Sequence, residues 1–287
     1  ESSNLRSILS ISAEKEIQVL LNVLLEKNIV CFIEKKFYTL LNEGNILDKK
    51  YPTFSNFSDL NESFDTLFTL GGDGTILRAV TYIRDLGIPI LGINTGRLGF
   101  LATINKKNIK KSVELILKGE FTIQERTLLS IKTSPKLEEF SELNFALNEV
   151  TIARKNTTSV IGVKTSLNKE YLTNYWADGL IIATPTGSTG YSLSCSGPVI
   201  SPDSKSLVIT PIAPHNLSAR SMVISDQTNI QLTIDSREKD FLISLDSRIS
   251  SVPKNTEVLV QKAPFTIKSI IPNDQSFLQT LRSKLLW

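Results

Sequence analysis

Hydrophobic and polar residues follow different patterns in the two halves of this chain. Up to about residue 120, short apolar runs typical of buried strands alternate with segments whose apolar residues repeat at helical spacing. We expect strands at residues 7–11, 28–33, 66–70 and 88–93, and helices at residues 13–26, 35–42, 76–85 and 107–118. Such alternation predicts a parallel sheet that helices cover on both faces.

Beyond residue 121, strand-like runs dominate the sequence. The expected strands are residues 127–133, 149–153, 161–167, 169–174, 179–184, 206–210, 231–234, 241–245, 257–261 and 265–270, and a short helix is expected at residues 276–286. The sequence therefore predicts a Rossmann-like α/β domain over residues 1–120 and a β-rich domain over residues 121–270.

The charge balance and hydropathy exclude some classes of partner. The 287 residues include 32 Lys and Arg and 29 Asp and Glu, which is a formal net charge of +3. Such an even balance of charges does not indicate a nucleic-acid partner. No apolar run approaches the ~20 residues that a membrane-spanning helix needs. The polar first residues do not resemble a signal peptide. We therefore expect small-molecule partners, with no nucleic acid and no membrane.

Few cysteines and histidines are present, which limits the chemistry. The chain contains two cysteines, Cys31 and Cys195, and one histidine, His215. A zinc site is therefore not expected, and we assign no residue as a metal ligand. Two distant cysteines indicate free thiols and a reducing, cytoplasmic location. A serine hydrolase would depend on His215, but the sequence lacks a Gly-x-Ser-x-Gly element.

The most informative segment is Gly-Gly-Asp-Gly-Thr at residues 71–75, between an expected strand and an expected helix. Main-chain N–H groups and the helix dipole favour an anion at such a turn, and glycine permits its close approach. Asp73 would repel a bare phosphate. We expect it to hold Mg²⁺ against phosphates or to accept a proton from an attacking hydroxyl. Phosphoryl transfer is indicated, although a tight turn with a capping aspartate has the same pattern.

A second segment combines small hydroxyl residues with glycine. Residues 184–190 read Thr-Pro-Thr-Gly-Ser-Thr-Gly and follow an expected strand. Their hydroxyl and N–H groups suit ribose, amide and phosphate groups, and Tyr191 offers a face for a base. Asn148 and Glu149 offer donors and acceptors for an adenine edge and ribose hydroxyls. A connecting loop and an exposed polar pair explain the same residues without a ligand.

Taken together and in this order, these segments resemble the NAD kinase family. The resemblance spans about residues 65–250 and rests on residues 71–75, 94–100, 148–149, 178–179, 184–189 and 214–220. The first of these also occurs in lipid kinases, whereas the Thr-Pro-Thr-Gly-Ser-Thr run and the Pro-His block at residue 214 are more specific. The resemblance implies that ATP, with Mg²⁺, donates its γ-phosphoryl group to the adenosine 2′-hydroxyl of NAD, forming NADP.

The resemblance also implies roles for individual residues. Asp73 matches the catalytic acid, and Gly74 matches a main-chain contact to the dinucleotide phosphates. Arg78, one helical turn further, is our addition as a phosphate contact, with a surface salt bridge as the alternative. The remaining matches to NAD-contacting positions are Asn148, Glu149, Asp178, Thr189, Gly190, Tyr191, Ser192, Leu193, Ser194, Ala213 and Asp246.

The family's architecture is an N-terminal α/β domain and a C-terminal β domain with the active site between them. By this resemblance, residues 271–287 pack back on the first domain, and the protein forms a homodimer or homotetramer. Two other functions stay open: a lipid or sugar kinase that shares the glycine-rich turn, and a non-catalytic sensor that binds NAD or NADP.

Overall fold

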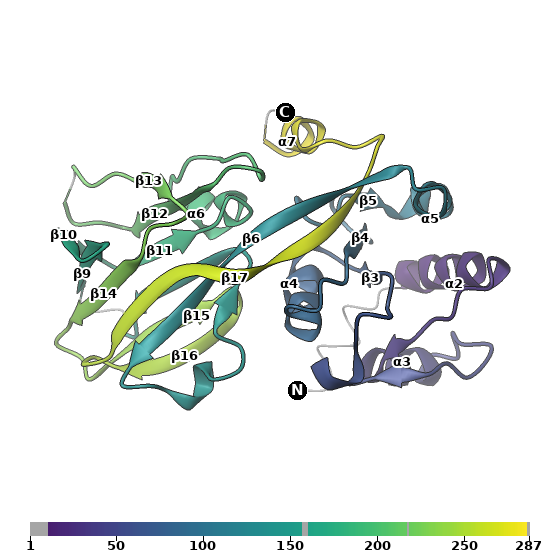
Figure 1. Cartoon of the computed structure of the whole chain (residues 1–287), viewed down its shortest axis with the longest axis horizontal. Helices are drawn as coiled ribbons and strands as arrows, with labels where there is room; N and C mark the ends of the chain where they lie inside the picture. The colour runs from purple at the N-terminus through teal and green to yellow at the C-terminus, as the bar shows by residue number, and fades with distance from the viewer. Residues whose placement is uncertain (1–10, 157–159, 217, 286–287) are drawn as a thin grey trace. The chain divides into compact units, whose positions relative to one another are not determined.

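The structure is a computed structural model that describes residues 11–156, 160–216 and 218–285. The chain divides into two compact units, residues 1–124 with 268–287 and residues 125–267. The boundaries predicted from the sequence, 120/121 and 270/271, lie a few residues away. Strands β6 (Phe121–Ser134) and β17 (Glu257–Pro272) contribute residues to both units (Figure 1).

The first unit is built around a small parallel sheet. Its helices are α2 (Ile11–Glu26), α3 (Lys35–Glu43), α4 (Asp73–Ile83), α5 (Ile109–Leu117) and α7 (Phe277–Leu285), with 3-10 turns at Phe57–Asp59 and Lys106–Asn108. Its strands are β1 (Ile33–Glu34), β2 (Thr53–Phe54), β3 (Leu67–Leu70), β4 (Ile90–Asn94) and β5 (Ile104–Asn105). Strands β3, β5 and the end of β17 pair in parallel with β4, and β1 pairs in parallel with β2.

Helices cover both faces of β4. Leu91 and Ile93 pack with side chains of α2 and α5, among them Leu24 and Val113. The alternate residue, Gly92, faces α4, where a β-carbon would lie 2.6 Å from the Ile76 side chain. Figure 1 shows α2 and α5 on one side of β3 and β4 and α4 on the other. The predicted α/β domain with a parallel sheet is confirmed.

The second unit is a β-sandwich. One sheet has the order β13-β12-β11-β8-β15-β16, and the other joins β10, β9, β14 and β17 with β6 and β7. The strands are β7 (Phe145–Ala146), β8 (Glu149–Arg154), β9 (Ile161–Leu167), β10 (Glu170–Ala177), β11 (Gly179–Ala183), β12 (Ser206–Ile212), β13 (Met222–Ser225), β14 (Ile230–Asp235), β15 (Asp240–Leu245) and β16 (Arg248–Pro253). Short helical turns occur at Glu138–Phe140, Gly187–Thr189 and Tyr191–Ser194, the last of which is α6. The predicted β-rich domain is confirmed.

Strand β11 is buried on both faces, which fixes where the following loop begins. Leu180 and Ile182 join the core between the two sheets. Ile181 and Ala183 point to the other face and pack beneath the segment that contains Cys195. Because every residue of β11 is buried, its end holds the loop at residues 184–195 against the sheet.

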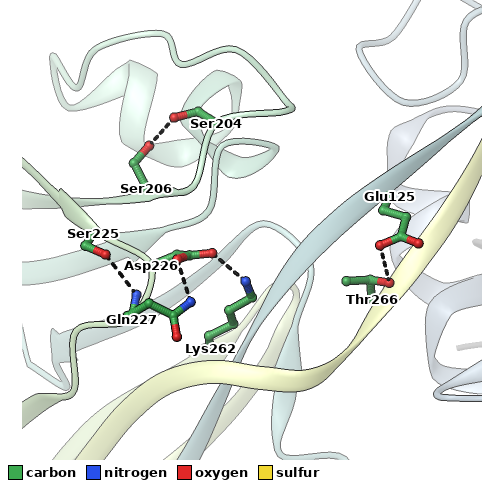
Figure 2. A network of polar contacts seen from close by, with 8 residues as sticks. All are labelled: Glu125, Ser204, Ser206, Ser225, Asp226, Gln227, Lys262 and Thr266. Carbon is green, nitrogen blue, oxygen red and sulfur yellow. Dashed lines mark hydrogen bonds and ion pairs between the residues drawn. The ribbon is translucent and has the colours of Figure 1, made fainter.

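Polar side chains of this unit form a group of hydrogen bonds and an ion pair (Figure 2). Asp226 is 2% exposed at its side chain and pairs with Lys262 of β17 at 2.5 Å. Burial alone would raise the pKa of Asp226, but hydrogen bonds from Lys262 and Gln227 outweigh burial and lower that pKa. Thr266 donates to Glu125 at 3.3 Å and joins β17 to β6. These contacts join β17 to the segment after β13 and to β6.

Several predicted elements differ from the structure. The strand expected at residues 28–33 is limited to β1, because only β1 pairs with β2, and Val30 is 77% exposed. The helix expected from residue 76 begins at Asp73, since the glycine-rich turn itself forms the first helical turn. The two strands expected at 257–261 and 265–270 are one strand, β17. The strand expected at residues 7–11 lies outside the described residues, except for Ile11 in α2.

Candidate functional site

The glycine-rich turn forms the start of α4. Gly72 precedes the helix and supplies no side-chain cap, and Asp73 is the first helical residue. Gly72 and Gly74 are exposed, and a β-carbon on either would meet no atom within 4 Å. The main chain at the start of α4 is therefore open to an anion, which the helix dipole favours. Arg78 is exposed one turn further along the same helix.

Asp73 binds the main chain of the loop that follows β4. Its Oδ2 accepts the N–H of Phe100 at 2.8 Å. Its Oδ1 accepts the N–H groups of Leu101 at 3.1 Å and Ala102 at 2.9 Å. Gly99 approaches so closely that a β-carbon there would overlap the Asp73 carboxylate. These charge-assisted bonds hold the carboxylate and the loop together at the start of α4.

Asn94 orders the beginning of the same loop. Asn94 is only 2% exposed. Its side-chain amide donates to the carbonyl of Arg97 at 2.8 Å and accepts the N–H of Gly96 at 2.8 Å. The segment that the sequence placed at the carboxyl end of a parallel strand is therefore held from both ends, by Asn94 and by Asp73.

In the second unit, the segment before β8 is bound through both its N–H and its C=O groups. One oxygen of Asp246 accepts the N–H of Leu147 at 2.9 Å. The other oxygen accepts the N–H groups of Asn148 at 2.8 Å and Glu149 at 3.2 Å. On the carbonyl side, the Thr184 hydroxyl donates to Leu147 at 2.6 Å, and the Thr184 N–H donates to Asn148 at 2.9 Å.

The loop after Thr184 crosses this segment. At Gly187, a β-carbon would overlap the main chain of Asn148, so only glycine permits the crossing. At Gly190, a β-carbon would lie 3.0 Å from Glu149 Oε2 and 3.5 Å from Asn148 Nδ2. The structure thus brings together three residues that the sequence predicted for one site: Asn148, Glu149 and Gly190.

Asn148 and Glu149 each present an acceptor that the protein leaves unmatched. Asn148 Oδ1 and Glu149 Oε2 are both buried, and neither accepts a hydrogen bond from a described residue. Buried polar atoms in proteins nearly always have a partner. Two neighbouring unmatched acceptors indicate a site for a ligand that carries O–H or N–H donors.

Glu149 has an unusual affinity for its proton. Burial, together with the nearby charge of Asp246, raises the pKa of Glu149 from 4.5 to about 7, against a hydrogen bond from the Tyr191 N–H that lowers it. Burial also raises the pKa of Asp246, although the N–H groups of residues 147–149 and the charge of Arg248 oppose this. The two carboxyl groups disfavour each other's charge in a buried position.

A second group of predicted residues lies where β10 meets β11. Asp178 forms an ion pair with Arg154 at 2.8 Å. The Asp178 N–H donates to the Ile212 carbonyl at 2.9 Å, so Asp178 lies beside Ala213, which is exposed and has a φ of +43°. Burial, Cys195, Asp178 and Glu149 raise the pKa of Tyr191, which places its ring within electrostatic range of both predicted groups.

The rest of the predicted loop divides into inward and outward residues. Ser192 is fully buried and shares a 2.9 Å hydrogen bond with the Thr210 hydroxyl, and Thr189 donates to the Thr186 carbonyl at 3.1 Å. Tyr191 is 45% exposed, Ser194 is exposed and Leu193 is half-buried. Ser192 therefore anchors the loop to β12, while Tyr191 and Ser194 face outward.

Three residues that hold these segments were not predicted individually from the sequence: Asn94, Thr184 and Arg154. Asn94 and Thr184 lie inside quoted segments, but a sequence does not show which hydroxyl or amide binds the main chain. Arg154 meets Asp178 because β8 pairs with β11, with Ala153 opposite Gly179. The strand pairing alone could have indicated this contact.

Two features are absent from the part of the chain that the structure describes. Within residues 11–156, 160–216 and 218–285, no three His, Cys, Asp or Glu side chains are grouped so that they could hold a metal ion. In the same part of the chain, no helix combines the length and apolar character that a membrane span requires.

We predict that Gly99→Ala destabilises the first unit. The added methyl group overlaps the Asp73 carboxylate, which must shift away from the N–H groups of residues 100–102. The free energy of unfolding should fall by about 1–3 kcal/mol in urea denaturation. Gly96→Ala is the matched control, because a β-carbon there meets no atom within 4 Å. Equal effects of the two substitutions would contradict the contact.

We also predict that Glu149→Gln changes the pH dependence of stability. Because native Glu149 has the higher pKa, its contribution to stability is complete below pH 4.5 and is lost as pH rises through about 7. That difference corresponds to on the order of 3 kcal/mol. Urea denaturation between pH 5 and 8 should show a smaller loss of stability for Glu149→Gln than for the unsubstituted protein. Glu257→Gln, at an exposed position of the same unit, serves as the control; identical pH profiles for all three proteins would refute the prediction.

Comparison with known proteins identifies the family. The ATP-NAD kinase N-terminal domain matches residues 12–121, and the ATP-NAD kinase C-terminal domain matches residues 147–271. An NAD kinase from Flavobacterium psychrophilum is 55% identical over 263 residues, which cover 91% of this chain and 89% of that protein. An NAD kinase from Christiangramia forsetii is 53% identical over 276 residues, which cover 96% and 94%.

Solved structures support the same fold. Yeast NADH kinase, solved with NADH, superposes with a TM-score of 0.82 at 24% identity, covering 97% of this chain and 84% of that one. An NAD kinase from Archaeoglobus fulgidus, solved with ATP, superposes with a TM-score of 0.69 at 25% identity, covering 88% and 96%. With both domain models matched and relatives above 50% identity along nearly the whole length, this chain belongs to the NAD kinase family.

Proposed function

We propose that this chain transfers the γ-phosphoryl group of ATP to the adenosine 2′-hydroxyl of NAD, and that Asn148 and Glu149 bind the adenosine part of NAD. The observation that carries the assignment is the pair of unmatched, buried acceptors on these two side chains. Ribose hydroxyls and the adenine amino group are donors, so they complement both acceptors. Glu149 in its ionised form would accept the stronger hydrogen bond from a hydroxyl.

The other residues of the second unit bind the rest of the dinucleotide in this proposal. Tyr191 and Ser194 face outward on the loop that follows Gly190, and Ser192 anchors this loop. Thr189, Gly190 and Leu193 complete the surface against adenine and ribose. Asp178 and Ala213, which the main chain brings side by side, bind the nicotinamide end.

Asp73 assists the transfer step. A carboxylate offers about four acceptor positions, and three N–H groups already use three of them. The remaining position is on Oδ2, which among the described residues accepts the Phe100 N–H alone. This position can accept a hydrogen bond from the hydroxyl that attacks the phosphorus. Phosphoryl transfer depends mainly on such positioning and on neutralising charge. Gly74 and Arg78 contribute at the start of α4, through an open main chain and an exposed guanidinium.

Mg²⁺ enters this reaction as part of the substrate, bound to ATP. Magnesium in phosphoryl-transfer sites typically keeps several waters and uses one or two carboxylates with the substrate phosphates. Because the open position on Asp73 Oδ2 is assigned to the attacking hydroxyl, the ion would keep its waters and the ATP phosphates as ligands, and a site with three protein ligands is not required. We further propose that the product is NADP and that the protein works in the cytoplasm as a homodimer or homotetramer.

The decisive experiment is a direct assay. The purified protein is incubated with ATP, MgCl₂ and NAD, and NADP is measured with an NADP-specific dehydrogenase. Formation of NADP supports the proposal. Phosphorylation of a lipid or sugar without NADP would favour another kinase, and binding of NAD without turnover would favour a sensor.

We predict that Asp73→Asn lowers kcat for NADP formation by about 10²–10⁴-fold, the usual range for removing a general base. Asparagine keeps one acceptor oxygen, and its amide would face one of the loop N–H groups, so the melting temperature should also fall. The dissociation constant for NAD, measured by calorimetry, should change little because the second unit binds the adenosine. Asp85→Asn, at an exposed site just beyond α4, is the control and should keep full kcat. An Asp73→Asn protein with unchanged kcat would remove Asp73 from the mechanism.

A further inference from the structure

The main chain of residues 147–149 is held from two opposite sides, and neither contact involves the side chains of Asn148 or Glu149. From this geometry we propose that Asp246 and Thr184 are positioning residues, which hold the Asn148–Glu149 pair in the arrangement that receives the adenosine of NAD. The inference rests on the proposed function of that pair. In this proposal the Asp246 carboxylate binds the protein's own main chain, whereas the family resemblance places Asp246 among the residues that contact NAD.

Asp246 has the geometry of a fixed clamp. Both carboxylate oxygens accept main-chain N–H groups, and its own N–H donates back to the Glu149 carbonyl at 3.0 Å. Its φ of +54° lies in the left-handed region, which aspartate and asparagine tolerate better than most residues. Ser244 stabilises this turn by donating to the Asp246 carbonyl at 2.6 Å.

Arg248 fixes the turn that carries Asp246 from its other end. The guanidinium donates to the carbonyl of Leu143 at 2.8 Å and also to that of Phe145. The Arg248 charge lies 5.4 Å from the centre of the Phe145 ring. The turn between β15 and β16 is thus tied to the same stretch of chain that leads into residues 147–149.

Thr184 closes the opposite side. Its side chain is fully buried, its hydroxyl donates to the Leu147 carbonyl, and the same oxygen accepts the Gly187 N–H at 3.1 Å. One hydroxyl therefore links the segment before β8 to the loop that carries Gly190. A shift of Thr184 would move both the segment that carries Asn148 and Glu149 and the loop that carries Gly190.

Positioning matters here because the unmatched acceptors are fixed by their main chain. If the main chain of residues 147–149 changes its orientation, Asn148 Oδ1 and Glu149 Oε2 no longer face the donor groups of the adenosine. Binding energy is lost when a site must be ordered at the moment of binding. Removing either clamp should therefore weaken NAD binding without altering the ATP contacts.

Asp246 also influences the charge of Glu149, which supplies an independent readout. The titratable groups that face Glu149 are Asp246, from the turn between β15 and β16, and Tyr191 from α6. Arg248 faces Asp246 in turn. Because the charge of Asp246 raises the pKa of Glu149, neutralising Asp246 should lower the pH at which Glu149 ionises.

The test uses two pairs of variants in the steady-state NADP assay. Asp246→Asn removes the charge, and asparagine tolerates the positive φ as aspartate does. Thr184→Val preserves the shape but removes the hydroxyl, and Thr184→Ser restores it. We expect Asp246→Asn and Thr184→Val to raise KM for NAD about tenfold or more. A lost hydrogen bond to a charged group, or a buried main-chain group left without its partner, corresponds to roughly that factor. KM for ATP should stay within twofold, and Thr184→Ser should return KM for NAD close to the original value.

Asp240→Asn provides the matched control on the same strand, β15. Its carboxylate pairs with Lys155 on the surface, and its KM values should not change. The inference is wrong if Asp246→Asn and Thr184→Val leave KM for NAD within twofold while Asn148→Ala raises it. If Asn148→Ala also leaves KM for NAD unchanged, the proposed function of the pair fails and the inference fails with it. Should Asp246→Asn not fold, the Thr184 pair decides the matter by the same criteria.

The pH profile separates positioning from a general loss of structure. In the unsubstituted protein, KM for NAD should fall as pH rises through about 7, because ionised Glu149 accepts the stronger bond. Glu149→Gln should flatten this profile. Any pH dependence that remains in this variant comes from titration of the substrates and can be subtracted. Asp246→Asn should move the inflection to lower pH, whereas an unmoved inflection would overturn the assigned contact between Asp246 and the pair.

Discussion

Hydrogen bonding of three consecutive N–H groups to one carboxylate is the constraint on which the candidate residues of each unit depend. In the first unit, Asp73 binds the N–H groups of residues 100–102. In the second, Asp246 binds those of residues 147–149. Successive N–H groups that point to one place cannot pair with a strand or helix, so a local acceptor must satisfy them. Each carboxylate thereby determines the path of a loop far from it in sequence.

The same contacts bear on how an acidic side chain can lie beside an anionic substrate. A carboxylate beside a phosphate would normally oppose binding. Asp73 and Asp246 are instead surrounded by main-chain dipoles, which offset part of their charge. Burial and the charge of Asp246 raise the pKa of Glu149 to about 7, and the Tyr191 N–H is the main-chain donor that opposes this rise. Of Glu149 and Asp246, Glu149 is the acid that keeps a buried oxygen without a partner among the described residues.

Particular residues show how far sequence reasoning reaches. The turn at residues 71–75, the pair at 148–149 and the loop from residue 184 were all recognisable, because each combines glycine or small polar residues with an adjoining apolar strand. The α/β and β-rich parts followed from the same apolar periodicity. Strands β13 and β16 were missed, since they are short edge strands whose side chains are largely solvent-accessible. The strand at residues 28–33 was overestimated, since apolar composition does not reveal whether a partner strand exists.

The order of apolar and polar residues by itself determined the two-part architecture, the position of each loop at the end of a strand, and the kinds of atoms that those loops offer. Only the tertiary structure decided which carboxylate binds the main chain and which keeps a free acceptor. In the sequence alone, Asp73, Glu149 and Asp246 are each an acidic residue beside an expected strand or turn. They differ because strand pairing brings N–H groups of distant residues to Asp73 and Asp246 and brings burial without enough donors to Glu149. Hydrogen bonds between distant segments depend on three-dimensional proximity, which local periodicity does not encode.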